Sequence, residues 1–334
     1  MDKKAFEIQF NWIFVLVAGA AILLFFTSVV VKQKSVGEIS TKTTVLKSIE
    51  AIIAGASVTI DTTKPESIPN SNIEFGCNKV SISGGAETVS KQYQNLILFA
   101  PSLIKGDKFT WQTMAFSTPY RATNLLFITS PQLRYIIIGS NALASEINKS
   151  LPVELKKEFY QSFPEIKNSN NYKVRFVVSQ DDMIGFPKAL EKMPDSDVTA
   201  IKFNGDIEKG NIEFWQKDGT SWSSKGSSFY MGKSSLIGAV YTDSLGVYEC
   251  NMQNVFSRLN LVTKIYTERT NKLLQKVVNR DCNQFYNNAL ASLNSIFTAS
   301  LKFDKQNLDT ISGASKLLSD DNKNAQTYSC PLIY

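Results

Sequence analysis

The feature that most constrains this chain is an uncharged run of 24 residues from Ile8 to Val31. A helix rises 1.5 Å per residue, so this run extends about 36 Å and is long enough to cross the hydrocarbon core of a bilayer. The run lacks proline, and Trp12 near its start is a residue type favoured at the membrane–water boundary. We therefore predict a short tail over residues 1–10 and a transmembrane helix over residues 11–31, with the lipid bilayer as a partner.

A cleaved secretory signal and a buried helix of a soluble protein are the alternatives to a membrane anchor. A cleaved signal has a shorter apolar region, about 7–15 residues, and ends in a small-x-small cleavage site, whereas this run ends in Thr27-Ser-Val-Val-Val-Lys32. A buried helix of a soluble protein rarely continues for 24 residues without a charge. An uncleaved, single-pass signal anchor is therefore the preferred interpretation.

The side of the membrane on which the folded part lies depends on two opposing signals. More lysines follow the apolar run than precede it, which by charge alone places the large domain in the cytoplasm. Against this stand four cysteines without a C-x-x-C pair, an even number that suits two disulfides in an oxidising compartment: Cys77, Cys250, Cys282 and Cys330. Asn148-Lys-Ser150 also matches the glycan-acceptor pattern. We expect the domain to be extracytoplasmic, at the cell surface.

Composition excludes several functions. The chain has no histidine, which removes Ser-His-Asp and Cys-His catalytic pairs and histidine-ligated zinc. Walker and G-x-G-x-x-G phosphate-binding patterns are also missing from the sequence. The net charge of +6 is mild for 334 residues and forms no basic block interleaved with aromatics, so we expect no nucleic-acid partner. No cofactor is expected, and an enzyme is less expected than a binding protein.

The segment after the anchor is expected to be a membrane-proximal helix and linker over residues 32–72. Apolar residues recur at helical spacing from Val45 to Ile53, which predicts a short amphipathic helix, either packed on the domain or lying on lipid. Residues 61–72 contain Pro65 and Pro69 and are predicted to be a loop.

Residues 73–245 are predicted to be an α/β domain with an initial β-rich part. Short strand-like runs occupy 73–75, 80–82 and 95–99. Stronger apolar runs at 124–128, 134–138, 172–178 and 198–203 are interrupted by helical patterns at 141–163 and 182–192. Strands that alternate with helices predict βαβ units and a mainly parallel sheet, which 212–215 and 236–241 are expected to extend.

The C-terminal segment, residues 246–334, is predicted to be helical and packed on the α/β domain. One long helix covers 251–280, followed by a second from Phe285 to Leu301 and a shorter third around 308–318. A partner-binding groove on these helices is the alternative to plain core packing. A continuous long helix separates Cys250 from Cys282 by more than about 40 Å, so these two cysteines are not expected to pair. An antiparallel second and third helix brings Cys282 near Cys330, and we therefore predict the pairs Cys282–Cys330 and Cys77–Cys250.

A candidate ligand or metal site lies at the carboxyl ends of two predicted parallel strands. It comprises Gly139, Ser140 and Asn141 after one strand and Asp181 and Asp182 after the next. The glycine turn can bring backbone N–H groups to an anion, and the two carboxylates can hold a divalent cation or exchange protons. Ser, Asn and Asp are also ordinary helix caps and Gly an ordinary turn residue, and capping is the preferred interpretation of these positions.

The first residues resemble those of known membrane proteins. Lys3-Lys-Ala-Phe-Glu7 resembles a prepilin start, although the acid expected five residues into the mature chain is replaced by Phe10. Phe6-Glu-Ile-Gln-Phe-Asn-Trp-Ile-Phe14 is similar to the start of archaeal single-pass membrane-anchored proteins. The resemblance covers the anchor region and implies no activity.

Three classes of function follow. The leading one is a membrane-tethered extracytoplasmic binding or structural protein that presents its ectodomain to a protein or glycan. The second is a pilin-like subunit of a surface filament. The third is a carboxylate- or metal-dependent enzyme with its site at Asn141, Asp181 and Asp182.

Overall fold

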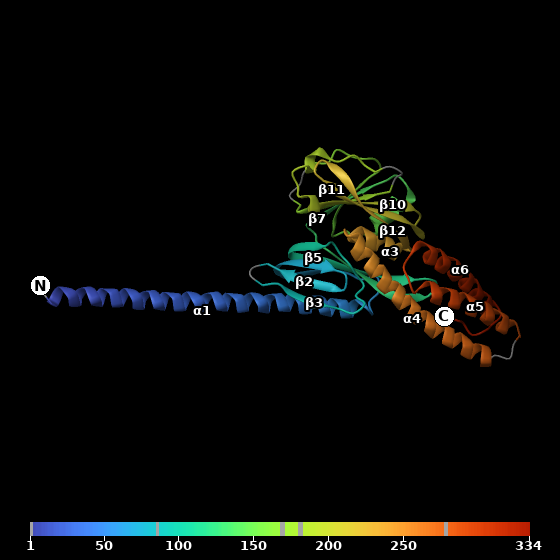
Figure 1. Ribbon diagram of the computed structural model, residues 1–334. Coiled ribbons are helices and arrows are strands. Elements are labelled where there is room, and N and C mark those ends of the chain that lie inside the picture. The colour runs from blue at the N-terminus through green and yellow to red at the C-terminus, as the bar shows by residue number, and fades with distance from the viewer. Residues whose placement is uncertain (1–2, 85–86, 168–170, 180–182, 277–279) are drawn as a thin grey trace.

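In the computed structural model, which describes residues 3–84, 87–167, 171–179, 183–276 and 280–334, one continuous helix dominates the shape. Helix α1 (Lys3–Ala56) is 54 residues long and projects from the folded part as a rod (Figure 1). Most of the large apolar side chains that are described along its free part, from Trp12 to Val36, are exposed. Its most apolar 18-residue window has a mean hydropathy of 2.7 and no buried residue. By length and composition this helix is able to cross a membrane.

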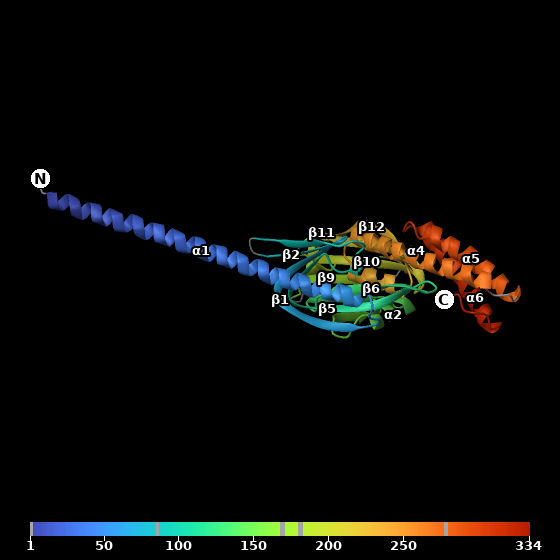
Figure 2. The same cartoon turned by 90° about the horizontal axis from the view of Figure 1, so that it is seen from below.

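The last turns of α1 are part of the folded domain. Val45 and Ile49 are fully buried and Leu46 is nearly so, which places the predicted amphipathic face against the domain. Figure 2 shows this end of α1 lying across the strands. The buried Lys42 ammonium donates hydrogen bonds to the carbonyls of Gly84 and Glu87. The predicted short helix is therefore the end of α1 and not a separate element.

The first sheet has the strand order β3-β2-β1-β5-β6-β4 and is antiparallel except for the β4–β6 pair. Its strands are β1 (Thr63–Gly76), β2 (Lys79–Ser83), β3 (Val89–Gln92), β4 (Leu98–Phe99), β5 (Leu103–Ser117) and β6 (Arg121–Thr129). One face of this sheet and the end of α1 share a core that includes Ile73, Ile104 and Ile128.

The predicted loop over 61–72 is wrong, because β1 begins at Thr63. Pairing of β1 with β2 starts only at Asn72, so residues 63–71 have a neighbouring strand on one side alone. Proline is tolerated on such an edge, where its missing N–H breaks no ladder hydrogen bond. A register shift between Ser67 and Ser71 accommodates Pro69.

The second sheet has the strand order β12-β11-β10-β9-β7-β8. Its strands are β7 (Leu133–Ile138), β8 (Lys156–Tyr160), β9 (Lys173–Val178), β10 (Val198–Gly205), β11 (Lys209–Asp218) and β12 (Ser221–Met231). The four neighbours β8, β7, β9 and β10 are parallel, whereas β10, β11 and β12 pair antiparallel. The predicted parallel arrangement thus applies to four strands, and the chain as a whole is an α/β protein with two mixed sheets.

Three predicted elements between the strands differ in the structure. The helix predicted over 141–163 is only α2 (Ala142–Ser150), because Pro152 follows it, and residues 156–160 form β8. The helix predicted over 182–192 is absent from the described residues 183–192, where Lys188–Leu190 form a single 3-10 turn after Pro187.

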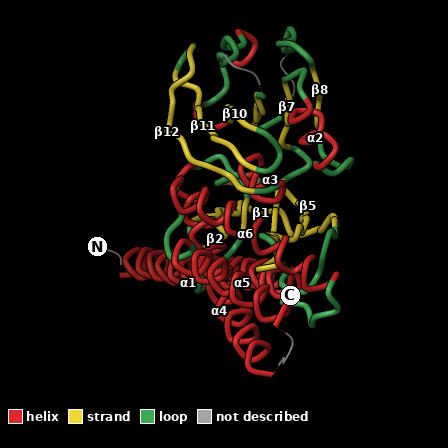
Figure 3. Tube along the Cα trace, turned by 90° about the vertical axis from the view of Figure 1, so that its right-hand side faces the viewer, coloured by secondary structure: helices red, strands yellow, loops and turns green. Residues whose placement is uncertain are grey.

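The run 236–241, predicted as a strand, lies in α3 (Lys233–Tyr241). Every residue from Ser234 to Tyr241 is buried, and a short run that is apolar throughout does not distinguish a buried strand from a buried helix. Helix α3 lies between the two sheets (Figure 3). The Tyr241 ring contacts Phe127 of β6 and Tyr135 of β7, with centroid distances of 5.3 and 6.1 Å. One core therefore joins both sheets.

Three helices complete the chain: α4 (Leu245–Lys276), α5 (Arg280–Ala299) and α6 (Lys305–Thr327). They correspond to the three helices predicted for the C-terminal segment, although α6 is longer than expected. Cys77 pairs with Cys250 and Cys282 with Cys330, at Cα–Cα distances of 5.8 and 5.7 Å. These are the predicted pairs, and they connect the β1–β2 turn to α4 and the start of α5 to the chain after α6.

Candidate functional site

The predicted site at the carboxyl ends of β7 and β9 is described only in part. Asn141 is the N-cap of α2, and its Oδ1 accepts a hydrogen bond from Ala144 N at 2.9 Å. The same side chain exchanges two hydrogen bonds with Ser179 at the end of β9, at 3.1 and 3.0 Å. Asn141 therefore caps α2 and joins it to the neighbouring strand end, as expected for a capping residue.

Gly139 is required by packing. A Cβ at this position would lie 2.6 Å from Ser179 O and 2.9 Å from the Cβ of Ala144. Ser140 is exposed between Gly139 and the cap. Asp181 and Asp182 lie outside the described residues.

Within the described ranges no cluster of three or more Cys, Asp or Glu side chains forms a metal site. Asn148, the predicted glycan acceptor, is partly exposed on α2. Its carbonyl accepts a hydrogen bond from Lys157 Nζ at 2.7 Å, and the hydroxyl of Ser150 in the same triplet donates to Glu146 O at 2.7 Å. The helix and the next strand are thus joined at this triplet.

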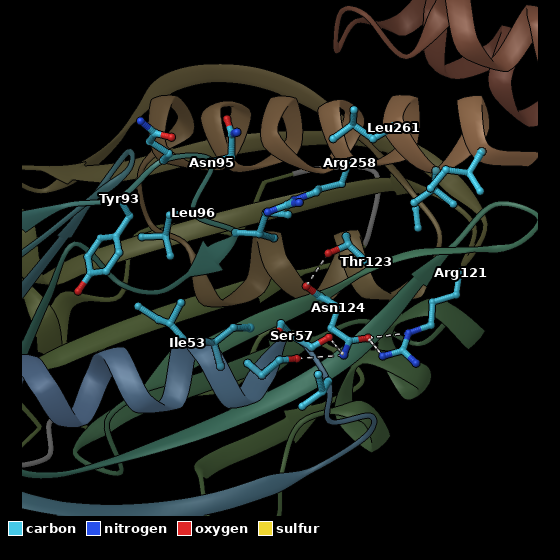
Figure 4. A pocket seen from close by; sticks show the side chains of 18 of the residues that line it. Ile53, Ser57, Tyr93, Asn95, Leu96, Arg121, Thr123, Asn124, Arg258 and Leu261 are labelled. Atoms are coloured by element: carbon cyan, nitrogen blue, oxygen red, sulfur yellow. Dashed lines mark hydrogen bonds between the residues drawn. The ribbon is translucent and has the colours of Figure 1, made fainter.

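A groove of about 1120 Å³ that the sequence did not predict lies in the folded part. It lies between the end of α1, the first residues of β6, the chain from Tyr93 to Ile97 and the middle of α4 (Figure 4). No protein-family model, curated protein or solved structure was found to match the chain. Assignment of a role to the groove therefore depends on its residues.

Asn124 on β6 fixes the wall that α1 provides. Its Nδ2 donates hydrogen bonds to the carbonyls of Ala56, Ser57 and Thr59 at 2.9, 3.3 and 2.6 Å, so that it satisfies carbonyls left free where α1 ends. Its Oδ1 accepts two hydrogen bonds from the Arg121 guanidinium, at 3.0 and 2.6 Å. Figure 4 shows Asn124 between Ser57 and Arg121, with the hydrogen bonds that join them. The groove is thus formed on a fixed joint between α1 and the first sheet.

The opposite wall exposes apolar side chains. Leu261 and Ile265 are one helical turn apart on α4 and are 56% and 63% exposed. On the α1 side, Val58, which follows the helix, is 75% exposed. Leu96 and Leu126 are buried in the floor. Apolar residues that gather around a hollow, rather than lying scattered over the surface, are typical of a binding site.

The charges around the groove are mainly positive. Arg121, Arg258 and Lys264 line it together with one acidic residue, Glu268. Figure 4 shows Arg258 reaching from α4 into the groove. None of the three cations takes part in an ion pair among the described residues. The groove therefore offers unneutralised positive charge beside exposed apolar surface.

Tyr93 contributes a polar group that the protein leaves unused. Its hydroxyl is buried and has no hydrogen-bond partner among the described residues, and burial raises the pKa of this phenol. A buried polar group without a partner is costly, so a ligand or water that bonds to it is favoured. The Tyr93 hydroxyl is therefore a buried group whose hydrogen-bonding capacity is not met by the described residues, and its residue is part of the groove lining.

One sequence signal for the groove was overlooked. The predicted stripe on α4 includes Val255, Leu259 and Val262, which the structure places at the core or partly buried. Leu261 and Ile265 lie off that stripe and leave the helix with a second apolar strip among charged residues. The remaining groove residues come from distant parts of the chain, so no local pattern predicts them.

Proposed function

We propose that this protein is a membrane-tethered binding protein whose ectodomain lies outside the cytoplasm and is presented to a protein or glycan partner. The observation that carries the proposal is the continuity of α1. One helix contains both the bare apolar segment and the buried face that packs on the first sheet. About 11 residues, or about 17 Å of helix, separate Val31 from the buried Lys42. Such a rod holds the domain at a fixed distance from the bilayer.

The two cysteine pairs support an extracytoplasmic location, because disulfides persist in oxidising compartments. The groove supports a binding role, because it is the place where exposed apolar and charged side chains gather. The Asn141 side chain of the predicted polar site is used for capping and for contacts with Ser179, so it gives an enzyme at that site no support.

The test is to express the full chain and measure its extraction and its accessibility. We expect it to stay in the membrane pellet after alkaline carbonate, and we expect protease added outside intact cells to digest the ectodomain. A matched variant, Leu16→Arg with Leu24→Arg, places two charges in the apolar segment and is expected to reduce insertion. Release of the parent chain without detergent, or complete protection from external protease, would contradict the proposal.

A second candidate, a subunit of a surface filament, is favoured by one observation. The helix that carries the bare apolar segment starts with Lys3-Lys-Ala-Phe-Glu7, which resembles a prepilin start, and its far end packs on an antiparallel sheet. In such a subunit the apolar parts of neighbouring α1 helices pack together in the filament. A mature chain that begins at Phe6, together with filaments in electron micrographs of the cell surface, is the outcome expected for this candidate.

A further inference from the structure

We propose that the groove between α1 and α4 binds an acidic amphipathic helix of a partner protein. This inference deepens the binding role proposed above and rests on it. It specifies the surface used and the chemistry of the partner. Three properties of the groove lead to it: size, apolar lining and charge.

The size suits a short helix. A volume of 1120 Å³ is about that of a cylinder 10 Å wide and 14 Å long, which corresponds to roughly two and a half turns of α-helix. The exposed Leu261 and Ile265 are spaced by four residues on α4. A partner helix with apolar residues at spacings of three and four residues can pack against such a strip, as in other helix-in-groove complexes.

The excess positive charge of the groove favours a partner helix that carries acidic residues. Arg121, Arg258 and Lys264 exceed the single acid Glu268, so a helix with Asp or Glu beside its apolar strip is attracted and one with Lys is repelled. Arg258, Lys264 and Arg121 are exposed. Ion pairs between these side chains and acidic residues of a partner therefore weaken as the salt concentration rises. Apolar burial then supplies most of the affinity, and the cations supply selectivity.

The protein's own bilayer is an unsuitable occupant. Ile53 in the groove lies 22 residues beyond Val31, which is about 33 Å along the helix from the end of the apolar run. A free fatty acid also has an apolar chain and a carboxylate. However, small-ligand sites bury most of the ligand, whereas Leu261, Ile265 and Val58 are all more than half exposed. A partner that brings its own surface covers these side chains.

The test uses the full chain in zwitterionic nanodiscs and a fluorescent 18-residue peptide designed as a helix, with Leu on one face and Glu beside it. A matched peptide has Lys in place of every Glu. We expect the Glu peptide to bind at least tenfold more tightly than the Lys peptide, and the difference to shrink in high salt. The double variant Leu261→Asp with Ile265→Asp is expected to lose binding of both peptides.

Charge reversal gives the sharper comparison. Arg258→Glu with Lys264→Glu is expected to weaken the binding of the Glu peptide at least tenfold and to strengthen the binding of the Lys peptide. The control is Lys305→Glu with Lys323→Glu, which makes the same charge change at exposed positions of α6 and is expected to bind like the parent. All four groove substitutions are at exposed positions, and circular dichroism with a non-reducing gel verifies folding.

Three results would overturn the proposal: no preference for the Glu peptide, an unchanged affinity after charge reversal in the groove, or stoichiometric displacement of the peptide by oleate, which would assign the groove to fatty acids. Carbonate extraction and protease accessibility are measured without any peptide. A failure of the groove proposal is therefore distinguishable from a failure of the membrane tether.

Discussion

Lys173 and Asp243 form an ion pair inside the molecule, where only 4% and 5% of the two side chains are exposed. Asp243 also accepts hydrogen bonds from the backbone N and the hydroxyl of Ser102, at 2.8 and 3.1 Å. Lys173 belongs to β9 of the second sheet, Ser102 precedes β5 of the first sheet, and Asp243 connects α3 to α4. Next to this pair, the buried Arg175 donates to the carbonyls of Ala239, Val240 and Thr242 at the end of α3. The two sheets and the helix between them are thus joined by buried charge.

Asp243→Asn removes one charge of this pair and leaves the Lys173 ammonium buried without its carboxylate. Loss of one partner of a buried ion pair costs about 3–5 kcal/mol, so we expect a large fall in the free energy of unfolding, measured with urea. Asp309→Asn is the control, because Asp309 pairs with Lys209 at the surface, where both side chains are about half exposed. That change is expected to cost less than about 1 kcal/mol. Equal losses in the two variants would show that the buried pair has no special role.

Asn124→Ala tests the joint between α1 and the first sheet. The change leaves carbonyls at the end of α1 without their donor, and each unsatisfied buried group costs about 1–3 kcal/mol. We expect faster amide hydrogen exchange over residues 50–60 and a loss of stability. Asn70→Ala is the control, since Asn70 is exposed on β1. If exchange over residues 50–60 is unchanged, the joint depends on apolar packing alone.

The elements with strong local patterns were predictable from the sequence. The strands at 124–128, 134–138 and 198–203 and the long helix α4 each bury a continuous apolar run or stripe. The disulfide pairs were predictable from two features together: a straight α4 keeps Cys250 far from Cys282, and antiparallel helices after it bring Cys282 near Cys330.

The rest depends on tertiary contacts. The run 236–241 is helical because it fills the space between two sheets, where Gly238 allows α3 to approach Phe99 closely: a Cβ there would lie 2.8 Å from the ring. The antiparallel first sheet was missed because β1 carries two prolines and β5 alternates irregularly between exposed and buried residues. The groove brings together α1, β6 and α4, which are far apart in sequence.

Asn141→Ala distinguishes capping from ligand binding. Loss of an N-cap side chain costs about 1 kcal/mol, so we expect a modest fall in melting temperature. Asn141→Ser restores an N-cap hydroxyl and is expected to recover part of the loss. The fall is expected to be the same with calcium and with a chelator. A calcium-dependent rise in melting temperature of the parent that Asn141→Ala abolishes would instead identify a metal site.

Glu158 gives the stability a pH dependence. Two hydrogen bonds from the Arg134 guanidinium, at 2.6 and 2.7 Å, lower the pKa of this carboxyl below its ordinary value of 4.5. The folded state therefore favours the ionised form of Glu158. The contribution of this carboxylate to the free energy of unfolding is present above pH 4.5 and is lost as the pH falls through the lowered pKa. We expect Glu158→Gln to cost about 1–2 kcal/mol at neutral pH.

The difference between Glu158→Gln and the parent is expected to disappear in acid, as measured by urea unfolding across the pH range. Glu165→Gln, at an exposed position, is the control for loss of one negative charge and is expected to follow the parent at every pH. A gap between Glu158→Gln and the parent that stays constant from neutral to acid pH would mean that the Arg134 contact does not discriminate between the two protonation states.

The two disulfides are expected to stabilise the fold to different extents. Cys282 and Cys330 are separated by 48 residues in the chain and Cys77 and Cys250 by 173. From the loss of loop-closure entropy in the unfolded chain, the disulfide of the shorter loop is expected to stabilise the fold by about 4 kcal/mol and that of the longer loop by about 5 kcal/mol. We expect Cys77→Ser with Cys250→Ser to lower the urea midpoint more than Cys282→Ser with Cys330→Ser. Peptide mapping of the parent checks the pairing itself, and a Cys250–Cys282 peptide would require a break in α4, contrary to the continuous helix from Leu245 to Lys276.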